Sequence, residues 1–277
     1  MRVFWVLVLL AGWISQAGAD EAKQLIESIN LYRSEPQRCG ERSSEELPPL
    51  SEDTRLSLPV EAPGDLQELL GRAGYPMVNV QAISLSGPRD AQAAMRALRE
   101  SFCKVLLDPQ FVDIGVSRLQ RDWRITLARP LLDGHLGDSA AEGRKMLELL
   151  NQARSSARQC GDQRFAPASA LAWNGSLAEA AGGHSRAMAN DNFFSHLGQD
   201  GRTPGDRAEL AGYEGRQVGE NIAAGQGDAR KVVDGWLASP GHCANLMNPQ
   251  FRDFGGAYAV DPQSDANIYW TGLFGAP

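Results

Sequence analysis

Apolar residues recur at intervals of three and four along three segments of the second half of the chain, which is the spacing of one buried helix face. The first two faces are formed by Met146, Leu149, Leu150 and Ala153 and by Leu177, Ala181, His184 and Met188. A third segment follows Asp228, a residue type that caps helix N-termini, and should end at Pro240-Gly241. Strand-like runs at residues 255–260 and 268–274 close this half. Helices followed by strands in one compact unit predict an α+β fold of packed layers.

The first 19 residues have the pattern of a secretory signal peptide. Arg2 gives a positive start, residues 3–14 form an apolar run of 12, and Ala17-Gly18-Ala19 fits a small-residue cleavage site. A membrane helix needs about 20 residues, so this run is too short to be one. We therefore expect an exported chain that begins near Asp20, is periplasmic or secreted, and has no transmembrane segment after signal removal.

Two stretches of the chain resemble each other in the same order. The Asn, Arg and Cys-Gly of residues 30–40 recur in residues 151–161 at an offset of 121. Residues 103–115, which begin at the second cysteine, recur in residues 243–255. We therefore predict a tandem repeat, in which the first copy is degenerate. The first copy, the linker and the second copy are predicted at residues 20–132, 133–142 and 143–277.

The four cysteines extend this argument. An exported chain meets an oxidising compartment, which favours disulfide bonds, and four cysteines allow three pairings. Composition does not choose among them, but a repeat implies one bridge within each copy. We therefore predict Cys39–Cys103 and Cys160–Cys243.

Composition narrows the class of partner. The 277 residues are 43% hydrophobic and 22% charged, which is typical of a globular chain. The formal net charge is -7 and no long basic run is present, so nucleic acid and anionic membrane surfaces are unsuitable partners. A small extracytoplasmic ligand or another protein remains.

The polar residues that could form a site occur only in the second copy. The first copy is about 17 residues shorter in the region that corresponds to His196. Glu220 aligns with Ala82, and His242 aligns with Phe102. The first copy therefore keeps the residues of a scaffold and lacks His196, Glu220 and His242.

Four motifs in the second copy carry a resemblance to a known family. They are Phe193-Phe194-Ser195-His196, Gly219-Glu220-Asn221-Ile222, the run from Trp236 to Asn245, and Tyr269-Trp270-Thr271. Together they resemble the CAP superfamily, the SCP-like extracellular family of cysteine-rich secretory, antigen five and pathogenesis-related proteins, in its bacterial form. The resemblance covers residues 143–275, and the first half resembles a degenerate copy of the same domain.

This resemblance implies an α-β-α sandwich with a central groove, which in the family is lined by two histidines and acidic residues. Some family members bind a divalent metal there. By motif, the groove residues here are His196, Glu220 and His242. Eukaryotic members place a second glutamate after the tryptophan helix, where this chain has Ser239, so the four-residue site is incomplete.

Three functions remain open, and the sequence does not decide whether the protein is an enzyme. The first is a binding module for a metal, small lipid, glycan or peptide, in which His196 and His242 could bind a divalent ion such as Zn²⁺. The second is a metal-assisted hydrolase or peptidase with Glu220 and His242 as catalytic candidates. The third is a structural or inhibitory protein whose degenerate half presents the partner surface.

Each candidate residue also has a structural alternative. His196 could bond to the backbone, and Glu220 could support the fold. His242 could lie at a helix end and interact with the helix dipole. His184 shares a face with apolar residues and is expected to be a half-buried structural histidine. Ser239 lacks an evident orienting carboxylate and is a poor nucleophile candidate.

Overall fold

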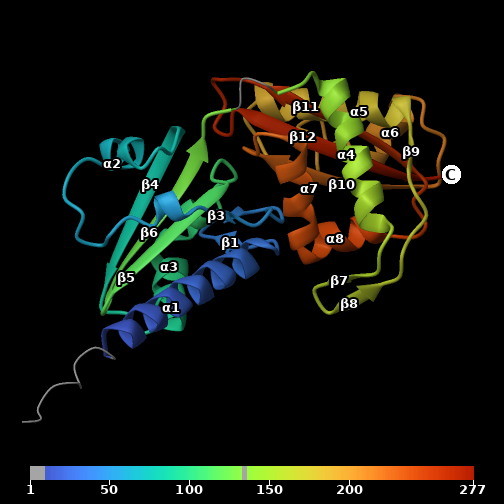
Figure 1. The fold of residues 1–277 in the computed structure, drawn as a ribbon. Helices are drawn as coiled ribbons and strands as arrows, with labels where there is room; N and C mark the ends of the chain where they lie inside the picture. The colour runs from blue at the N-terminus through green and yellow to red at the C-terminus, as the bar shows by residue number, and fades with distance from the viewer. Residues whose placement is uncertain (1–9, 133–135) are drawn as a thin grey trace, which may run out of the picture.

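The chain folds around two four-stranded sheets, one in each half (Figure 1). The structure, a computed structural model, describes the backbone of residues 10–132 and 136–277 and the side chains from residue 20 onward. The start of the predicted signal peptide, residues 1–9, and residues 133–135 of the predicted linker lie outside the described residues. Within the described part, no helix is both long enough and apolar enough to cross a membrane.

The first half contains three α-helices, one 3-10 helix and six strands among its described residues. In chain order they are α1 (Leu10–Arg33), β1 (Arg38–Cys39), β2 (Arg42–Ser43), β3 (Ser51–Glu52), η1 (Thr54–Leu56), α2 (Leu66–Arg72), β4 (Met77–Ser86), α3 (Ala91–Leu106), β5 (Asp113–Leu119) and β6 (Asp122–Pro130). The sheet order is β3-β5-β6-β4, in which β3 is parallel to β5 and the other pairs are antiparallel.

The second half has a sheet with corresponding connections. Its elements are α4 (Ser139–Arg154), β7 (Arg158–Cys160), β8 (Gln163–Phe165), β9 (Ala172–Trp173), α5 (Gly175–Asn190), α6 (Pro204–Leu210), β10 (Gln217–Ala224), α7 (Ala229–Ala238), α8 (Pro240–Met247), β11 (Asp253–Val260) and β12 (Ile268–Ala276). The sheet order is β9-β11-β12-β10, with β9 parallel to β11. All three predicted helices and both predicted strands are present, and α4 begins inside the segment predicted as linker.

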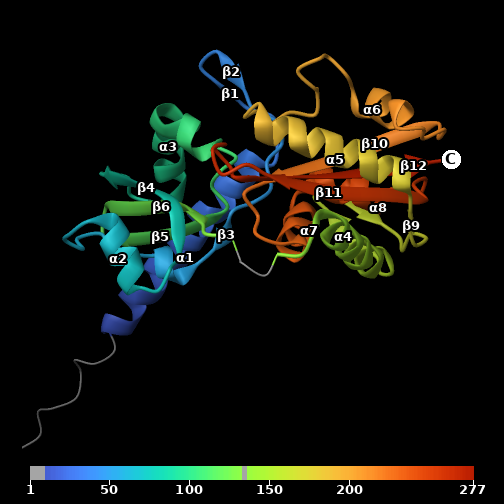
Figure 2. The ribbon, with the colours of Figure 1, turned by 90° about the horizontal axis from the view of Figure 1, so that it is seen from above.

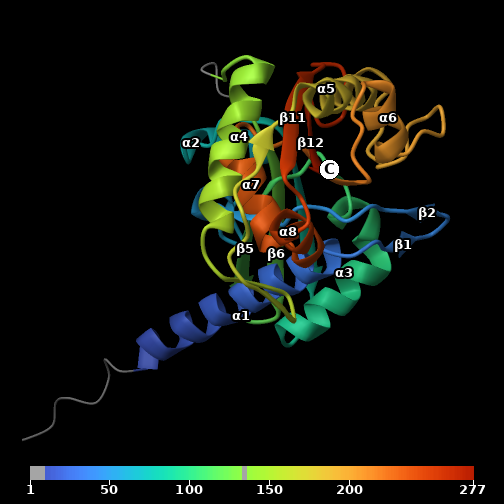
Figure 3. The same ribbon diagram turned by 90° about the vertical axis from the view of Figure 1, so that its right-hand side faces the viewer.

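Helices cover both faces of the second sheet (Figures 2 and 3). The helices α5 and α6 lie on one side, and α4, α7 and α8 lie on the other. The β12 side chains alternate accordingly: Trp270 and Phe274 join the core under α4, α7 and α8, whereas Tyr269 and Leu273 face α5. This half therefore has the layers that an α+β unit needs to bury both faces of its sheet.

A helical segment contacts a sheet glycine in each half, namely α5 in the second half and η1 in the first. A side chain at Gly255 would overlap the backbone of Leu177 and Ala178, where α5 crosses the sheet. At Gly115, the aligned residue, a side chain would overlap the backbone at Leu56, in the three-residue helix η1. The two contacts are alike, but η1 has 3 residues whereas α5 has 16.

A buried arginine ends the first helix of each half in the same way. Arg33 and Arg154 are 2% and 0% exposed, and both guanidinium groups donate only to backbone carbonyls. The acceptors are Pro48, Leu106, Asp108 and Phe111 for the first arginine and Ser169, Leu246, Asn248 and Phe251 for the second. Each arginine therefore fixes two distant loops to its helix.

Both disulfide bonds are present as predicted. Cys39 pairs with Cys103 and Cys160 pairs with Cys243, and no cysteine in the described chain is free. Each bridge joins a short hairpin to a helix, namely β1–β2 to α3 and β7–β8 to α8. The bridges thus close separate loops within the two halves.

Candidate functional site

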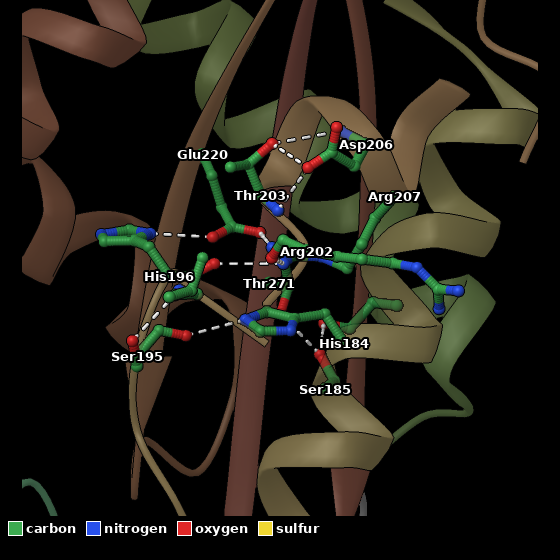
Figure 4. A network of polar contacts seen from close by, with 12 residues as sticks. His184, Ser185, Ser195, His196, Arg202, Thr203, Asp206, Arg207, Glu220 and Thr271 are labelled. Atoms are coloured by element: carbon green, nitrogen blue, oxygen red, sulfur yellow. Dashed lines mark hydrogen bonds and ion pairs between the residues drawn. The ribbon is translucent and has the colours of Figure 1, made fainter. Parts of the chain in front are cut away.

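Three side chains of the second half form a continuous polar chain (Figure 4). Glu220 lies on strand β10, and its Oε1 accepts a hydrogen bond from His196 Nδ1 at 2.8 Å. Its Oε2 forms an ion pair with Arg207 Nη2 at 2.6 Å. The Glu220 side chain is 1% exposed and that of His196 is 33% exposed. Both carboxylate oxygens are therefore occupied inside the protein, and His196 is the end of the chain that solvent reaches.

Local structure fixes Arg207 in this position. Helix α6 begins with a capping box in which Thr203 and Asp206 satisfy each other's backbone amides. Arg207 directly follows Asp206 in α6. Its side chain also donates to the backbone carbonyl oxygens of His196 at 3.1 Å and Arg202 at 2.9 Å. The arginine thus links the loop that carries His196 to the strand that carries Glu220, a contact that the sequence analysis missed.

The carboxylate changes the charge balance of His196. Burial alone would lower the pKa of this imidazole, but the hydrogen bond to Glu220 and its negative charge, assisted by Glu45, raise the pKa above the ordinary value of 6.5. His196 therefore carries more positive charge near neutral pH than a free histidine does.

His184, on helix α5, contacts the loop that carries Ser195 and His196. Its ring is 1% exposed, and Nε2 lies 2.9 Å from the Ser195 carbonyl oxygen, to which it donates (Figure 4). Burial lowers the pKa of His184, so the ring is neutral near pH 7. These contacts are those of the structural histidine that we expected. The side chain is fully buried, whereas we expected it to be half-buried.

His242 lies at the start of a helix, which corrects one prediction. We expected a helix to end at Pro240-Gly241, but α7 ends at Ala238 and Pro240 is the first residue of α8. Proline is favoured at the first helical position because its missing N–H leaves no bond unmade. His242 is thus in the first turn of α8, where the helix dipole opposes a positive charge and does not stabilise it.

The His242 ring is buried and neutral. Burial lowers its pKa to about 3, and the charge on His196 lowers it further in the same direction. Nδ1 lies 3.2 Å from Ser239 Oγ, whereas Nε2 is buried and has no hydrogen-bond partner among the described residues. The two histidines are therefore close enough for one charge to affect the other, although no hydrogen bond joins His242 to Glu220.

Two asparagine side chains join strand β10 to helix α8. Asn221, next to Glu220, donates to the His242 carbonyl oxygen at 3.1 Å. Asn245 of α8 donates to the Asn221 side-chain oxygen at 2.8 Å. Helix α8 and strand β10 are thus fixed to each other beside the site.

Two glutamates of the first half reach this region, and sequence reasoning did not find them. Glu46 accepts hydrogen bonds from the Ser239 hydroxyl and from the backbone N–H of His242 at 3.1 Å. Glu45 accepts from the Ser195 hydroxyl at 2.8 Å. The only signal in the sequence is an acidic pair at a position where the second half has Ala166-Pro167.

The donor set in this arrangement does not fit a metal ion. Among the described residues, no three His, Cys, Asp or Glu side chains are grouped so that they could hold one. Both oxygens of Glu220 are already engaged by His196 and Arg207. A metal at His196 and His242 is therefore an expectation that rests on the resemblance alone.

Comparison with known proteins finds similarity to one family within the second half. The CAP model, for the cysteine-rich secretory protein family, matches residues 147–274. The uncharacterized membrane protein YlbC of Bacillus subtilis (strain 168) is 39% identical over 85 residues, which are 31% of this chain and 25% of the relative. The uncharacterized protein YkwD of the same organism is 33% identical over 98 residues, which are 35% of this chain and 36% of the relative. The chain therefore spans well under half of either relative.

An extracellular protein containing a SCP domain from Bacillus anthracis str. Ames aligns with a TM-score of 0.42 and 25% identity, over 57% of this chain and 53% of that one.

Proposed function

We propose that residues 147–274, which match the model of the CAP family, form a CAP domain and that the protein is an exported binding module whose ligand contacts His196. The observation that carries the proposal is the Arg207–Glu220–His196 chain. A buried carboxylate held by a cation fixes the imidazole in one orientation and leaves its outer edge accessible. Such a preorganised polar group is typical of small-molecule sites, because it costs little ordering when the ligand arrives.

A cavity of about 490 Å³ lies at the Phe193-Phe194 end of the loop that carries His196 and offers the space for a ligand, although His196 itself is not part of its lining. Phe193 and Phe194, which precede Ser195-His196, give it an apolar wall. Arg42, Lys104 and Glu45 of the first half add charges of both signs. This lining suits a small ligand that combines an apolar part with charged groups, so a short peptide or a small lipid fits better than an uncharged glycan.

We also propose that the first half is a degenerate copy of the CAP domain. The corresponding sheet orders, the buried arginines Arg33 and Arg154, and the glycine contacts at Gly115 and Gly255 support this origin. Export is supported by the amino-terminal pattern and by the two disulfides.

The proposed function is tested by titrating the full-length protein with four probes: a short peptide library, a lysophospholipid, a disaccharide panel and Zn²⁺. We expect at least one charged amphipathic probe to shift the NMR signals of His196 and Phe194. His196→Ala should weaken that binding at least tenfold, whereas Gln199→Ala, an exposed change in the same loop, should leave it unchanged. Equal binding by the His196 variant and the wild type would exclude the proposed site.

A further inference from the structure

The segment that carries Glu45 and Glu46 is held rigidly by the first half. The backbone N–H of Ser44 donates to the Gln37 carbonyl oxygen at 2.9 Å, and that of Leu47 donates to the Arg33 carbonyl oxygen at 2.9 Å. The Leu47 side chain is buried. The two glutamates thus lie between two backbone anchors, and the segment lies against the end of the second half that holds α7 and α8 (Figures 1 and 3).

The second half is shaped to accept the Glu46 carboxylate. Ser239 is the N-cap residue of α8, but its hydroxyl makes no cap hydrogen bond within its own helix and donates to Glu46. The His242 amide, in the first turn of α8, donates to the same carboxylate. A side chain at Gly241 would overlap Glu46 Oε2, so only glycine leaves room for this approach. Glu46 therefore caps α8 from the other half of the molecule.

The same contact determines which nitrogen of His242 carries the proton. Glu46 Oε1 lies 3.3 Å from Nδ1, and an ionised carboxylate can only accept hydrogen bonds. The neutral ring must therefore hold its proton on Nδ1, where both Glu46 and Ser239 are within reach. This leaves the lone pair on Nε2, the buried atom without a partner among the described side chains. Nε2 is thus available to accept a hydrogen bond from a ligand.

We propose that Glu46 is a positioning residue contributed by the first half, and that the site of the second half is complete only with it. Glu46 fixes the orientation and the tautomer of His242 and orders the first turn of α8. The proposal rests on the proposed function in so far as His242 belongs to the binding site. It also explains what the first half supplies, because Pro167, the residue aligned with Glu46, has no carboxylate.

The test uses the full-length protein and needs no ligand, so its failure is separate from failure of the binding proposal. Nitrogen-15 NMR of the His242 ring should show one protonated and one unprotonated nitrogen in the wild type. In Glu46→Ala both signals should move toward the average of two tautomers, and the His242 amide should exchange at least tenfold faster. In Glu46→Gln, whose amide oxygen still accepts hydrogen bonds, both the ring signals and the amide exchange rate should stay close to those of the wild type.

Two further variants make the result decisive. Glu41→Ala removes an exposed glutamate of the same half and should change neither readout. Gly241→Ala should reproduce the Glu46→Ala signature with the carboxylate still present, because the added methyl displaces it, although alanine normally favours a helix. The proposal is overturned if Glu46→Ala and Gly241→Ala leave the His242 ring and amide unchanged.

Discussion

The pKa values of His242 and His196 shift in opposite directions, although burial alone would lower both. His242 is fully enclosed, so its pKa falls to about 3 from the ordinary value of 6.5. His196 is also partly enclosed, but Glu220 lies at hydrogen-bond distance and its charge raises the pKa. Both rings have a carboxylate oxygen near Nδ1, at 2.8 Å for Glu220 and His196 and at 3.3 Å for Glu46 and His242. At His196 the hydrogen bond and charge of Glu220 outweigh burial, whereas at His242 complete burial dominates.

The pKa of His242 predicts how stability changes in acid. Between about pH 3 and pH 6.5 the unfolded chain binds a proton at this residue and the folded chain does not. The free energy of unfolding should therefore fall as the pH decreases through this window, by up to about 1.4 kcal/mol per pH unit from this group. Urea unfolding between pH 4 and pH 8 measures the slope.

His242→Gln should make the slope below pH 6.5 shallower. His196 contributes to the slope in the opposite sense. Its raised pKa stabilises the folded state below pH 6.5, and this contribution is lost as the pH rises through the folded-state pKa. His196→Gln should therefore remove stability in acid that the wild type has. A His242→Gln profile parallel to the wild type would contradict the assignment.

Some single residues were predictable and others were not. Asp228 was expected to cap a helix, and its side chain accepts from the Lys231 amide at the start of α7. Pro240 was interpreted as a helix terminator, but proline is also favoured at a helix start, and the local sequence does not distinguish the two.

At the scale of elements, helices α4, α5 and α7 followed from apolar periodicity, whereas the short helices α6 and α8 and strand β10 did not. That strand begins Gln217-Val218-Gly219-Glu220-Asn221, where polar residues and a glycine interrupt the strand pattern. Its Gly219 packs against Phe251 and Asn245, so a side chain would not fit there. The strand carrying Glu220 was therefore hidden because residues that serve the site replace residues that signal a strand.

The buried arginine at the end of the first helix of each half gives a further prediction. Arg154 joins α4 to three loop carbonyls and to the end of α8. Lysine has one charged nitrogen and cannot span four acceptors, so Arg154→Lys should leave several of them unpaired. We expect a loss of about 3 kcal/mol or more in the free energy of unfolding.

Urea unfolding measures this loss, with Arg230→Lys on an exposed position of α7 as the control, which should stay within about 0.5 kcal/mol of the wild type. A similarly small change for Arg154→Lys would show that the carbonyls find other partners.

At the scale of the whole molecule, internal repetition predicted the two separate disulfides. The docking of the halves could not be predicted, because it depends on side chains that meet only after each half has folded. Gly225, for example, packs against Gln110 and Val112, and Arg129 donates to the Asp265 carbonyl oxygen. Gln110 and Val112 belong to the repeated stretch 103–115, but that pattern does not indicate a contact with the other half. The acidic pair Glu45-Glu46 likewise does not indicate that Glu46 reaches α8.

The most direct test of the shared site is the energetic coupling between Glu46 and Ser239, which lie in different halves. Glu46→Ala, Ser239→Ala and the double variant form a double-mutant cycle measured by urea unfolding. We predict a coupling of at least about 1 kcal/mol, since a hydrogen bond to a charged group is worth about 1.5–3 kcal/mol. Glu41→Ala combined with Ser239→Ala should be additive. Additivity within about 0.5 kcal/mol for Glu46 and Ser239 would contradict a site shared between the two halves.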